Sequence, residues 1–268
     1  MPVDEIVRLL SESGCDAIEI GGQPSREDID QLLDALRETG LKVSGITPLC
    51  RWPTEERDLA HPDPAARERA VDYYTGCIDL ASMVGAPSVG LITVGVGRVA
   101  PEADPAGEWR EAVIGARQIA EHAADRGIEL GIEAVNRYES YMIRTAEQAM
   151  AFAEEVGPDN VGVILDLFHM GIEEPRPAEA VSAAADRLVA LHIAGPTRAA
   201  PDPQAPADRI DEPIAAAVRG GFDGPFVIEC TAAGYDPFNA DKGPEAMEEL
   251  RNSMETAVES VRGSIARA

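Results

Sequence analysis

Seven short apolar runs alternate along the chain with longer segments of helical periodicity. Each run is four to six residues long and carries apolar side chains on both faces, which is typical of a parallel strand covered on both sides. The runs that predict strands are 17–20, 42–46, 88–93, 129–134, 161–166, 188–193 and 226–229.

The intervals between these runs have apolar residues at helical spacing. In 27–38, for example, Ile29, Leu32 and Leu36 share one helix face. The same pattern predicts helices over 3–13, 65–84, 107–126, 145–156 and 245–265. Strands that alternate with helices predict a parallel sheet, and 268 residues is the usual size of one closed β/α barrel. We therefore expect a single α/β domain over 1–268, a (β/α)8 TIM barrel.

The barrel predicted in this way is one strand short. A closed barrel of this type has eight strands, and the sequence opens on a helix ahead of its first apolar run. An unfilled position exposes strand edges, which proteins normally cover. We therefore expect the first strand to be missing from this chain and a native first strand to lie upstream of Met1. Upstream DNA without in-frame codons for a strand would contradict that hypothesis.

Composition excludes several classes of partner. The chain has 48 acidic and 23 basic residues, a formal net charge of −25, so it repels nucleic acids and anionic membranes. The acidic composition fits a halophile or a GC-rich genome, and the sequence leaves both open. No apolar run approaches the ~18 residues of a membrane span, no signal peptide is evident, and the four cysteines form no CxxC pair. We expect a cytoplasmic protein with free thiols.

Four apolar runs in the second half of the chain each end in a residue that can ligate a metal. These residues are Glu133, Asp166, His192 and Glu229. In a β/α barrel the C-terminal ends of the strands form the rim where active sites lie. Three carboxylates and one imidazole there predict a site for a divalent cation. Taken singly, each acidic residue could instead be a solvated rim residue or a helix N-cap.

These residues resemble the xylose-isomerase-like sugar isomerase and epimerase barrels, and within them the ketohexose 3-epimerases that act on D-tagatose, D-psicose or L-ribulose. The resemblance covers nearly the whole chain, including 17–20 and 58–67. It implies an isomerase of carbohydrate metabolism whose metal, Mn²⁺ or else Co²⁺ or Mg²⁺, is held by the four residues above. It also implies a small sugar substrate and a homodimer or homotetramer.

The resemblance further implies that Glu139, His169 and Arg198 bind the sugar. Each has an alternative interpretation. Glu139 could be a loop carboxylate paired with Arg137, and His169 could be a packed core histidine. Arg198 enters the Pro/Ala-rich segment 199–206, whereas the corresponding arginine of the epimerases usually lies in a glycine-rich loop.

The implied chemistry explains why such residues are needed. Epimerisation beside a carbonyl removes a weakly acidic C–H proton and returns one on the opposite face, through a cis-enediolate that a metal stabilises. Glu133 and Glu229 would exchange the roles of base and acid. Asp166 and His192 would be ligands alone, with the second ring nitrogen of His192 held by an acceptor that the sequence does not reveal. Glu19, which ends an early strand, is a candidate either as a carboxylate behind the ligands, with no partner specified, or as an acceptor for a sugar hydroxyl.

Other functions remain open at this stage, because one fold supports several reactions. The same glutamates would serve an aldose–ketose isomerase of the hydroxypyruvate isomerase kind, or an inosose isomerase or dehydratase. A non-catalytic sugar-binding or accessory subunit is a further alternative, favoured if the barrel lacks a strand. Endonuclease IV shares the fold, but it needs more histidine ligands than this chain offers and a surface that tolerates DNA.

Overall fold

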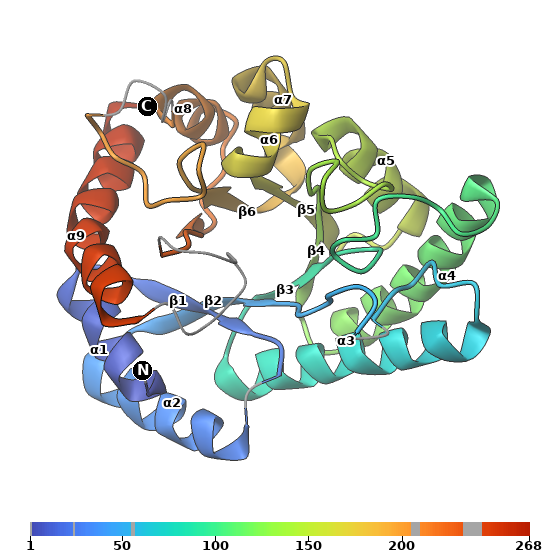
Figure 1. The fold of residues 1–268 in the computed structure, drawn as a ribbon, viewed down its shortest axis with the longest axis horizontal. Helices are drawn as coiled ribbons and strands as arrows, with labels where there is room; N and C mark the ends of the chain where they lie inside the picture. Colours follow the sequence, from blue (N-terminus) through green and yellow to red (C-terminus); the bar gives the residue numbers. More distant parts are fainter. Residues whose placement is uncertain (1, 24, 55–56, 205–209, 233–242) are drawn as a thin grey trace.

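Within the residues that the structure describes, seven parallel strands form one curved sheet at the centre of the protein (Figure 1). The structure is a computed structural model that describes residues 2–23, 25–54, 57–204, 210–232 and 243–268. The strands pair in the order of the sequence, each with the next. Their bounds are β1 (Ala17–Gly21), β2 (Lys42–Thr47), β3 (Ser88–Leu91), β4 (Glu129–Glu133), β5 (Val161–Asp166), β6 (Leu188–Ile193) and β7 (Phe226–Ile228).

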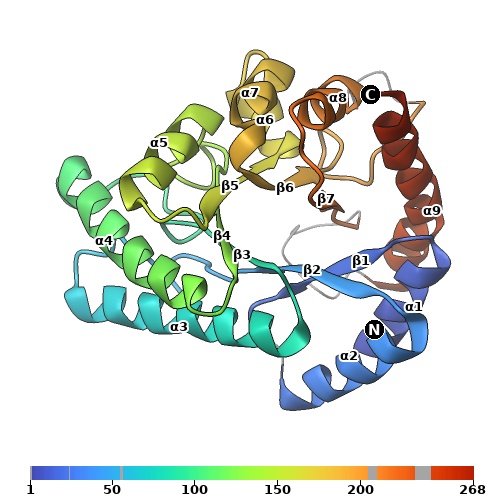
Figure 2. The same cartoon turned by 180° about the vertical axis from the view of Figure 1, so that it is seen from behind.

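Helices surround the sheet on its outer side (Figures 1 and 2). Six of them were expected from the sequence: α1 (Val3–Glu12), α2 (Arg26–Thr39), α3 (Pro64–Val84), α4 (Pro105–Ala124), α5 (Ala146–Val156) and α9 (Gly243–Arg267). The sequence analysis did not predict four shorter elements: α6 (Leu167–Glu173), α7 (Pro177–Ala184), the 3-10 turn η1 (Ala185–Arg187) and α8 (Asp211–Arg219). Among the helices of the described residues, none is long and apolar enough to cross a bilayer.

Local signals in the sequence explain where α2 begins and ends. The Ser25 hydroxyl accepts a hydrogen bond from the backbone N–H of Asp28, and the Asp28 carboxylate accepts one from the N–H of Ser25. This reciprocal capping box satisfies donors that the first helical turn leaves free. The helix stops at Gly40, whose φ of 77° lies in the left-handed region that glycine adopts without strain. The chain then turns directly into β2.

The main apolar core lies between the strands and the surrounding helices. β3, β5 and β6 are its most enclosed strands, because every residue in them is buried. Neighbouring backbones approach closely here. A Cβ atom on Gly162 would lie 2.3 Å from the carbonyl oxygen of Arg187, so only glycine fits at this position in β5.

The barrel is open along one line, between β1 and β7. Within the described residues, β1 pairs only with β2 and β7 only with β6, and Figure 2 shows the two end strands apart. All three residues of β7 are only half-buried. A cavity of about 620 Å³ lies at this open edge, lined by both strands and by apolar residues of α9 such as Met254 and Val258. The prediction of a TIM barrel with seven strands is therefore confirmed.

Candidate metal centre

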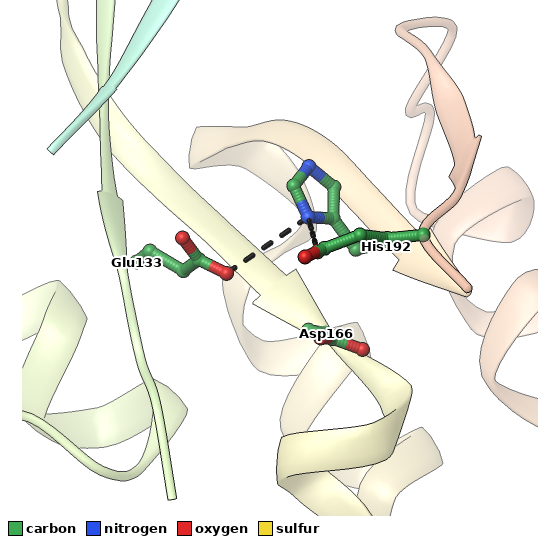
Figure 3. A group of neighbouring side chains, drawn as sticks. Glu133, Asp166 and His192 are labelled. Carbon is green, nitrogen blue, oxygen red and sulfur yellow. Dashed lines mark hydrogen bonds and ion pairs between the residues drawn. The ribbon is translucent and has the colours of Figure 1, made fainter. Parts of the chain in front are cut away.

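Four side chains from four strand ends meet at the C-terminal rim of the barrel. Glu133 closes β4, Asp166 closes β5, His192 lies one residue before the end of β6, and Glu229 follows β7. One potential ligand atom from each residue lies within 4.8 Å of those of the others. Figure 3 shows Glu133 and His192 pointing toward one another, with Asp166 beside them. The structure thus brings together all four residues that the sequence singled out as metal ligands.

Asp166 divides its two oxygens between the helix that follows and the site. Its Oδ1 accepts a hydrogen bond of 2.8 Å from the backbone N–H of Phe168 and so caps α6. Its Oδ2 is buried and has no hydrogen-bond partner among the described residues. A buried carboxylate oxygen without a donor is costly, and a cation at this point would satisfy it.

The His192 ring presents Nδ1 to the glutamates. This atom lies 2.7 Å from Glu229 Oε2 and 3.9 Å from Glu133 Oε1, and Figure 3 marks its contact with Glu133 by a dashed line. The imidazole is 1% exposed. Burial disfavours the charged ring, but the carboxylates of Glu19 and Glu229 outweigh this and raise the pKa of His192 well above its ordinary value.

The two glutamates have opposite acidities. Burial, together with the negative charge of Glu229, raises the pKa of Glu133 to about 8. Burial acts on Glu229 in the same direction, but hydrogen bonds and charge from His192 and Arg198 outweigh it and lower its pKa to about 2. The pKa of Asp166 lies between those of the two glutamates, because burial and the charge of Glu229 raise it to about 6. Burial and repulsion between carboxylates thus raise the pKa of two of the three acidic residues, as expected where such side chains lie together without a cation.

The donor set fits a divalent metal. Three carboxylates and a neutral imidazole suit Mn²⁺, Co²⁺ or Mg²⁺, and the unpartnered Asp166 Oδ2 lies in the same cluster of described residues. The identity of the ion does not follow from these ligands alone.

His169, one of the expected sugar contacts, lies beside the four residues on α6. Its Nδ1 accepts a hydrogen bond of 3.2 Å from the backbone N–H of Asn136, so Nδ1 carries no proton and Nε2 carries one. Nε2 lies 3.5 Å from Asp166 Oδ2. Burial and the nearby Arg198 lower the pKa of His169 to about 3, so this ring is a neutral donor that faces the site.

Glu139 also reaches the site, and its alternative pairing with Arg137 is wrong. Arg137 instead forms a two-bond ion pair with Glu173, at 2.8 and 2.9 Å. Glu139 accepts a hydrogen bond of 3.0 Å from Asn136 Nδ2, and its Oε1 lies 3.7 Å from Arg198 Nη1. Asn136, which the sequence analysis did not single out, therefore contacts both Glu139 on its own loop and His169 on α6.

Arg198 lies between the four candidate metal ligands and the expected sugar contact Glu139. Its guanidinium donates a short hydrogen bond to Glu229 and lies 3.7 Å from both Asp166 Oδ2 and Glu139 Oε1. Its backbone has a φ of 59°, in the left-handed region that residues other than glycine seldom adopt, and such conformations often mark functional sites. The departure of 199–206 from a glycine-rich sequence does not keep the arginine out of the site; residues 205–206 of that segment lie outside the described residues.

A buried ion-pair cluster fixes the loop that carries Glu139. Arg98 is 2% exposed and pairs with Asp58 at 2.9 Å and with Glu108 at 2.8 Å. The neighbouring Gly97 donates its backbone N–H to the carbonyl oxygen of Glu139, at 2.7 Å. The sequence analysis missed this support, because Arg98 and its partners lie in different segments with no recognisable spacing.

Comparison with known proteins agrees with this architecture. The model of the xylose isomerase-like TIM barrel family matches residues 7–256, and the chain belongs to that family. It is 31% identical to a D-psicose 3-epimerase of Enterocloster bolteae over 72% of this chain and 65% of that protein. It is 30% identical to a ketose 3-epimerase of Arthrobacter globiformis over 83% of this chain and 75% of that protein. The chain thus spans just under two thirds of the length of the first of these relatives.

Solved structures show the same fold at lower identity. A D-psicose 3-epimerase with D-tagatose from Clostridium cellulolyticum H10 superposes with a TM-score of 0.86 at 24% identity, covering 99% of this chain and 94% of that one. A D-allulose 3-epimerase from Methylomonas sp. in complex with D-allulose also has a TM-score of 0.86, at 23% identity, and covers 98% of this chain and 91% of that one. These similarities establish the fold.

Proposed function

We propose that this chain is a divalent-metal-dependent sugar epimerase that inverts C3 of a free ketose. The observation that carries the proposal is the meeting of Glu133, Asp166, His192 and Glu229 at the rim, with ligand atoms within 4.8 Å of one another. The relatives support the same reaction class, since they are named D-psicose and ketose 3-epimerases. Those names belong to the relatives and make a ketose the first substrate class to test.

The four residues would hold the cation, with Mn²⁺ the first candidate. When bound, the cation supplies Lewis acidity that polarises the sugar carbonyl and its neighbouring hydroxyl. Asp166 would serve through Oδ2, which accepts no hydrogen bond from any described residue, and His192 through Nδ1, which faces the glutamates. Neither residue has a proton-transfer role in this proposal.

The protein's own proton chemistry would belong to the two glutamates. Glu133 projects from β4 and Glu229 follows β7, so they reach the site from separated positions on the rim. One carboxylate would take the C3 proton and the other would return a proton to the opposite face, with the roles reversed in the reverse reaction.

Three further residues would hold the sugar beside the metal. His169 Nε2–H offers a donor, the Glu139 carboxylate an acceptor, and the Arg198 guanidinium several donors. All three lie within the same cluster of contacts as the four ligands. We expect the enzyme to act as a homodimer or homotetramer, as the sequence resemblance implies.

Hydrogen exchange with solvent tests the proposal directly. The purified protein, loaded with Mn²⁺, is incubated in deuterated buffer with D-psicose, D-tagatose, D-fructose and L-ribulose in turn, and each sugar is analysed by NMR and mass spectrometry. Deuterium at C3 together with the C3 epimer is the expected result. Deuterium at C1 or C2 would identify an aldose–ketose isomerase instead. The absence of exchange with a filled metal site would leave a sugar-binding subunit. The same protein stripped with a chelator is the control.

A further inference from the structure

The second ring nitrogen of His192 points away from Glu133 and Glu229 and toward β1. Its Nε2 is buried and has no partner with hydrogen-bond geometry among the described residues. Glu19 Oε2, from the third residue of β1, lies 3.5 Å from it. The imidazole is 1% exposed and the Glu19 side chain 11%. His192 therefore lies between two sets of carboxylates, with Nδ1 toward the site and Nε2 toward Glu19.

The Glu19 carboxylate is itself held in place. Thr47, at the end of β2, donates a short hydrogen bond to its Oε1, which leaves Oε2 toward the imidazole. Gly45 is the residue paired with Glu19 across the two strands. A Cβ atom on Gly45 would lie 3.1 Å from Glu19 Oε2, so glycine leaves the space that this oxygen occupies. Three residues on two strands thus set one oxygen opposite Nε2.

This arrangement selects one tautomer of a metal-bound histidine. A histidine ligand binds through an unprotonated nitrogen and keeps its proton on the other nitrogen. An acceptor at Nε2 places the proton there, which leaves the Nδ1 lone pair free to face Glu133, Asp166 and Glu229. Carboxylate–histidine–metal triads of this kind orient the ring and raise its basicity as a ligand.

We propose that Glu19 is the positioning residue for His192: it holds the proton on Nε2 and thereby makes Nδ1 the metal ligand. The inference rests on the metal site of the proposed function, although not on the reaction performed there. In this proposal Glu19 contacts neither the metal nor the sugar. It acts only through His192. Thr47 and Gly45 complete the arrangement by fixing the direction of the carboxylate.

Metal affinity is the first test. Free Mn²⁺ is measured by electron paramagnetic resonance during titration of wild type, Glu19→Gln and Glu19→Ala. We expect Glu19→Ala to weaken Mn²⁺ binding about 10- to 100-fold, the usual cost of losing such a partner, and Glu19→Gln to weaken it less because an amide oxygen can still accept from Nε2. Gly45→Ala keeps the carboxylate but crowds Oε2, so it should weaken binding while leaving Glu19 in place.

Glu139→Gln is the matched control. Like the Glu19 variants, it removes one negative charge, and the Glu139 side chain is 17% exposed against 11% for Glu19. Glu139 lies in the same region but does not contact His192 Nε2. We expect its Mn²⁺ affinity to change less than about fivefold. Equal losses in Glu139→Gln and the Glu19 variants would show that only the summed charge matters and would overturn the proposal. Unchanged affinity in Glu19→Ala would overturn it as well.

A spectroscopic readout separates positioning from general stability. In the Co²⁺-loaded protein the Nε2–H proton of a histidine bound through Nδ1 gives a strongly shifted NMR resonance that disappears in deuterated water. It should persist in wild type and Glu139→Gln and broaden through solvent exchange in Glu19→Ala. Its unaltered presence in Glu19→Ala would contradict the proposal. Wild-type protein that binds Mn²⁺ but exchanges no ketose proton would refute the proposed function and leave this inference standing.

Discussion

The enclosed side of the barrel and its open edge each carry one glutamate of the site, and the pKa values of the two are shifted in opposite directions. At the end of β4, Glu133 has a side chain that is 5% exposed, while Glu229, beyond the half-buried β7, is 31% exposed. No hydrogen bond from the described residues compensates the burial of Glu133, and its pKa is raised to about 8. Glu229 receives hydrogen bonds from His192 and Arg198, and its pKa is lowered to about 2. Burial acts in the same direction on both carboxyl groups, and the donors that only Glu229 has reverse its effect there.

Replacement of each glutamate is the largest expected effect in this comparison. We expect Glu133→Gln and Glu229→Gln each to lower the rate of C3 exchange by roughly 10²–10⁴-fold, because each removes a proton carrier. The measurement is deuterium incorporation into a ketose at saturating Mn²⁺. If Glu133 and Glu229 play equivalent parts in the reaction despite their different surroundings, the two variants will lose similar amounts of exchange activity.

Far-UV circular dichroism and Mn²⁺ titration of both variants serve as controls, since an amide oxygen can still ligate a metal. A variant that folds, binds Mn²⁺ and retains full exchange would refute the proton-transfer role of that glutamate. A large loss in one variant alone would show that the open and enclosed positions do not share the chemistry.

The enclosed side and the open edge also differ in how tightly they pack, with a smaller expected effect that is measurable as a loss of unfolding free energy. Ile132 in β4 is fully buried, while Ile228 in β7 is half-buried beside the open edge. We expect Ile132→Ala to lower the free energy of unfolding by about 4 kcal/mol, and Ile228→Ala by about 1–2 kcal/mol because less apolar surface is lost. Urea denaturation of the two variants measures the difference. Equal losses would mean that the open edge packs as tightly as the enclosed side.

Stability of the metal-stripped protein should fall as the pH rises from 6.5 to 8. Between these values the folded protein retains protons on Glu133 and His192, whose pKa values are raised above those of the unfolded chain. The unfolded chain holds fewer protons in this range, so unfolding becomes easier as the pH increases. The effect should be on the order of 2 kcal/mol, measured by urea denaturation.

His169 does not oppose this trend in the same range. Its folded pKa of about 3 lies below its ordinary value, so its contribution to stability is complete above about pH 6.5 and is lost only as the pH falls. Glu133→Gln should reduce the decline between pH 6.5 and 8, whereas a decline that is unchanged in this variant would assign the effect to another group. Saturating Mn²⁺ should remove the decline, because the metal requires the deprotonated ligands.

Much of this architecture could be read from the chain because buried parallel strands leave a strong signal. All seven strands were predicted, with ends within two residues of those observed, since a run of four to six residues that is apolar on both faces is too short for a buried helix. The helix α6 was missed because it begins directly after β5 and has only seven residues, too few to show a period. Its start depends on the cap that Asp166 provides, which a sequence pattern does not distinguish from a metal ligand.

The site was predictable to the extent that its residues end strands. Glu133, Asp166, His192 and Glu229 follow from the ends of the predicted strands, and the family resemblance added Glu139, His169 and Arg198. Asn136, Thr47 and Arg98 were not found as contributors, because their roles depend on contacts between distant segments, such as the 2.9 Å pair of Arg98 with Asp58. Polar residues in loops carry such roles without any regular spacing.

The cap that Asp166 places on α6 has a consequence for coordination. Oδ1 already accepts the Phe168 N–H at 2.8 Å, whereas Oδ2 accepts no hydrogen bond from any described residue, so Oδ2 is the oxygen that Asp166 would offer to a cation. Asp166 would then hold a cation through one oxygen and His192 through one nitrogen, which would leave room on the ion for oxygens of a substrate. The start of a short helix thereby decides which oxygen of Asp166 the site can use.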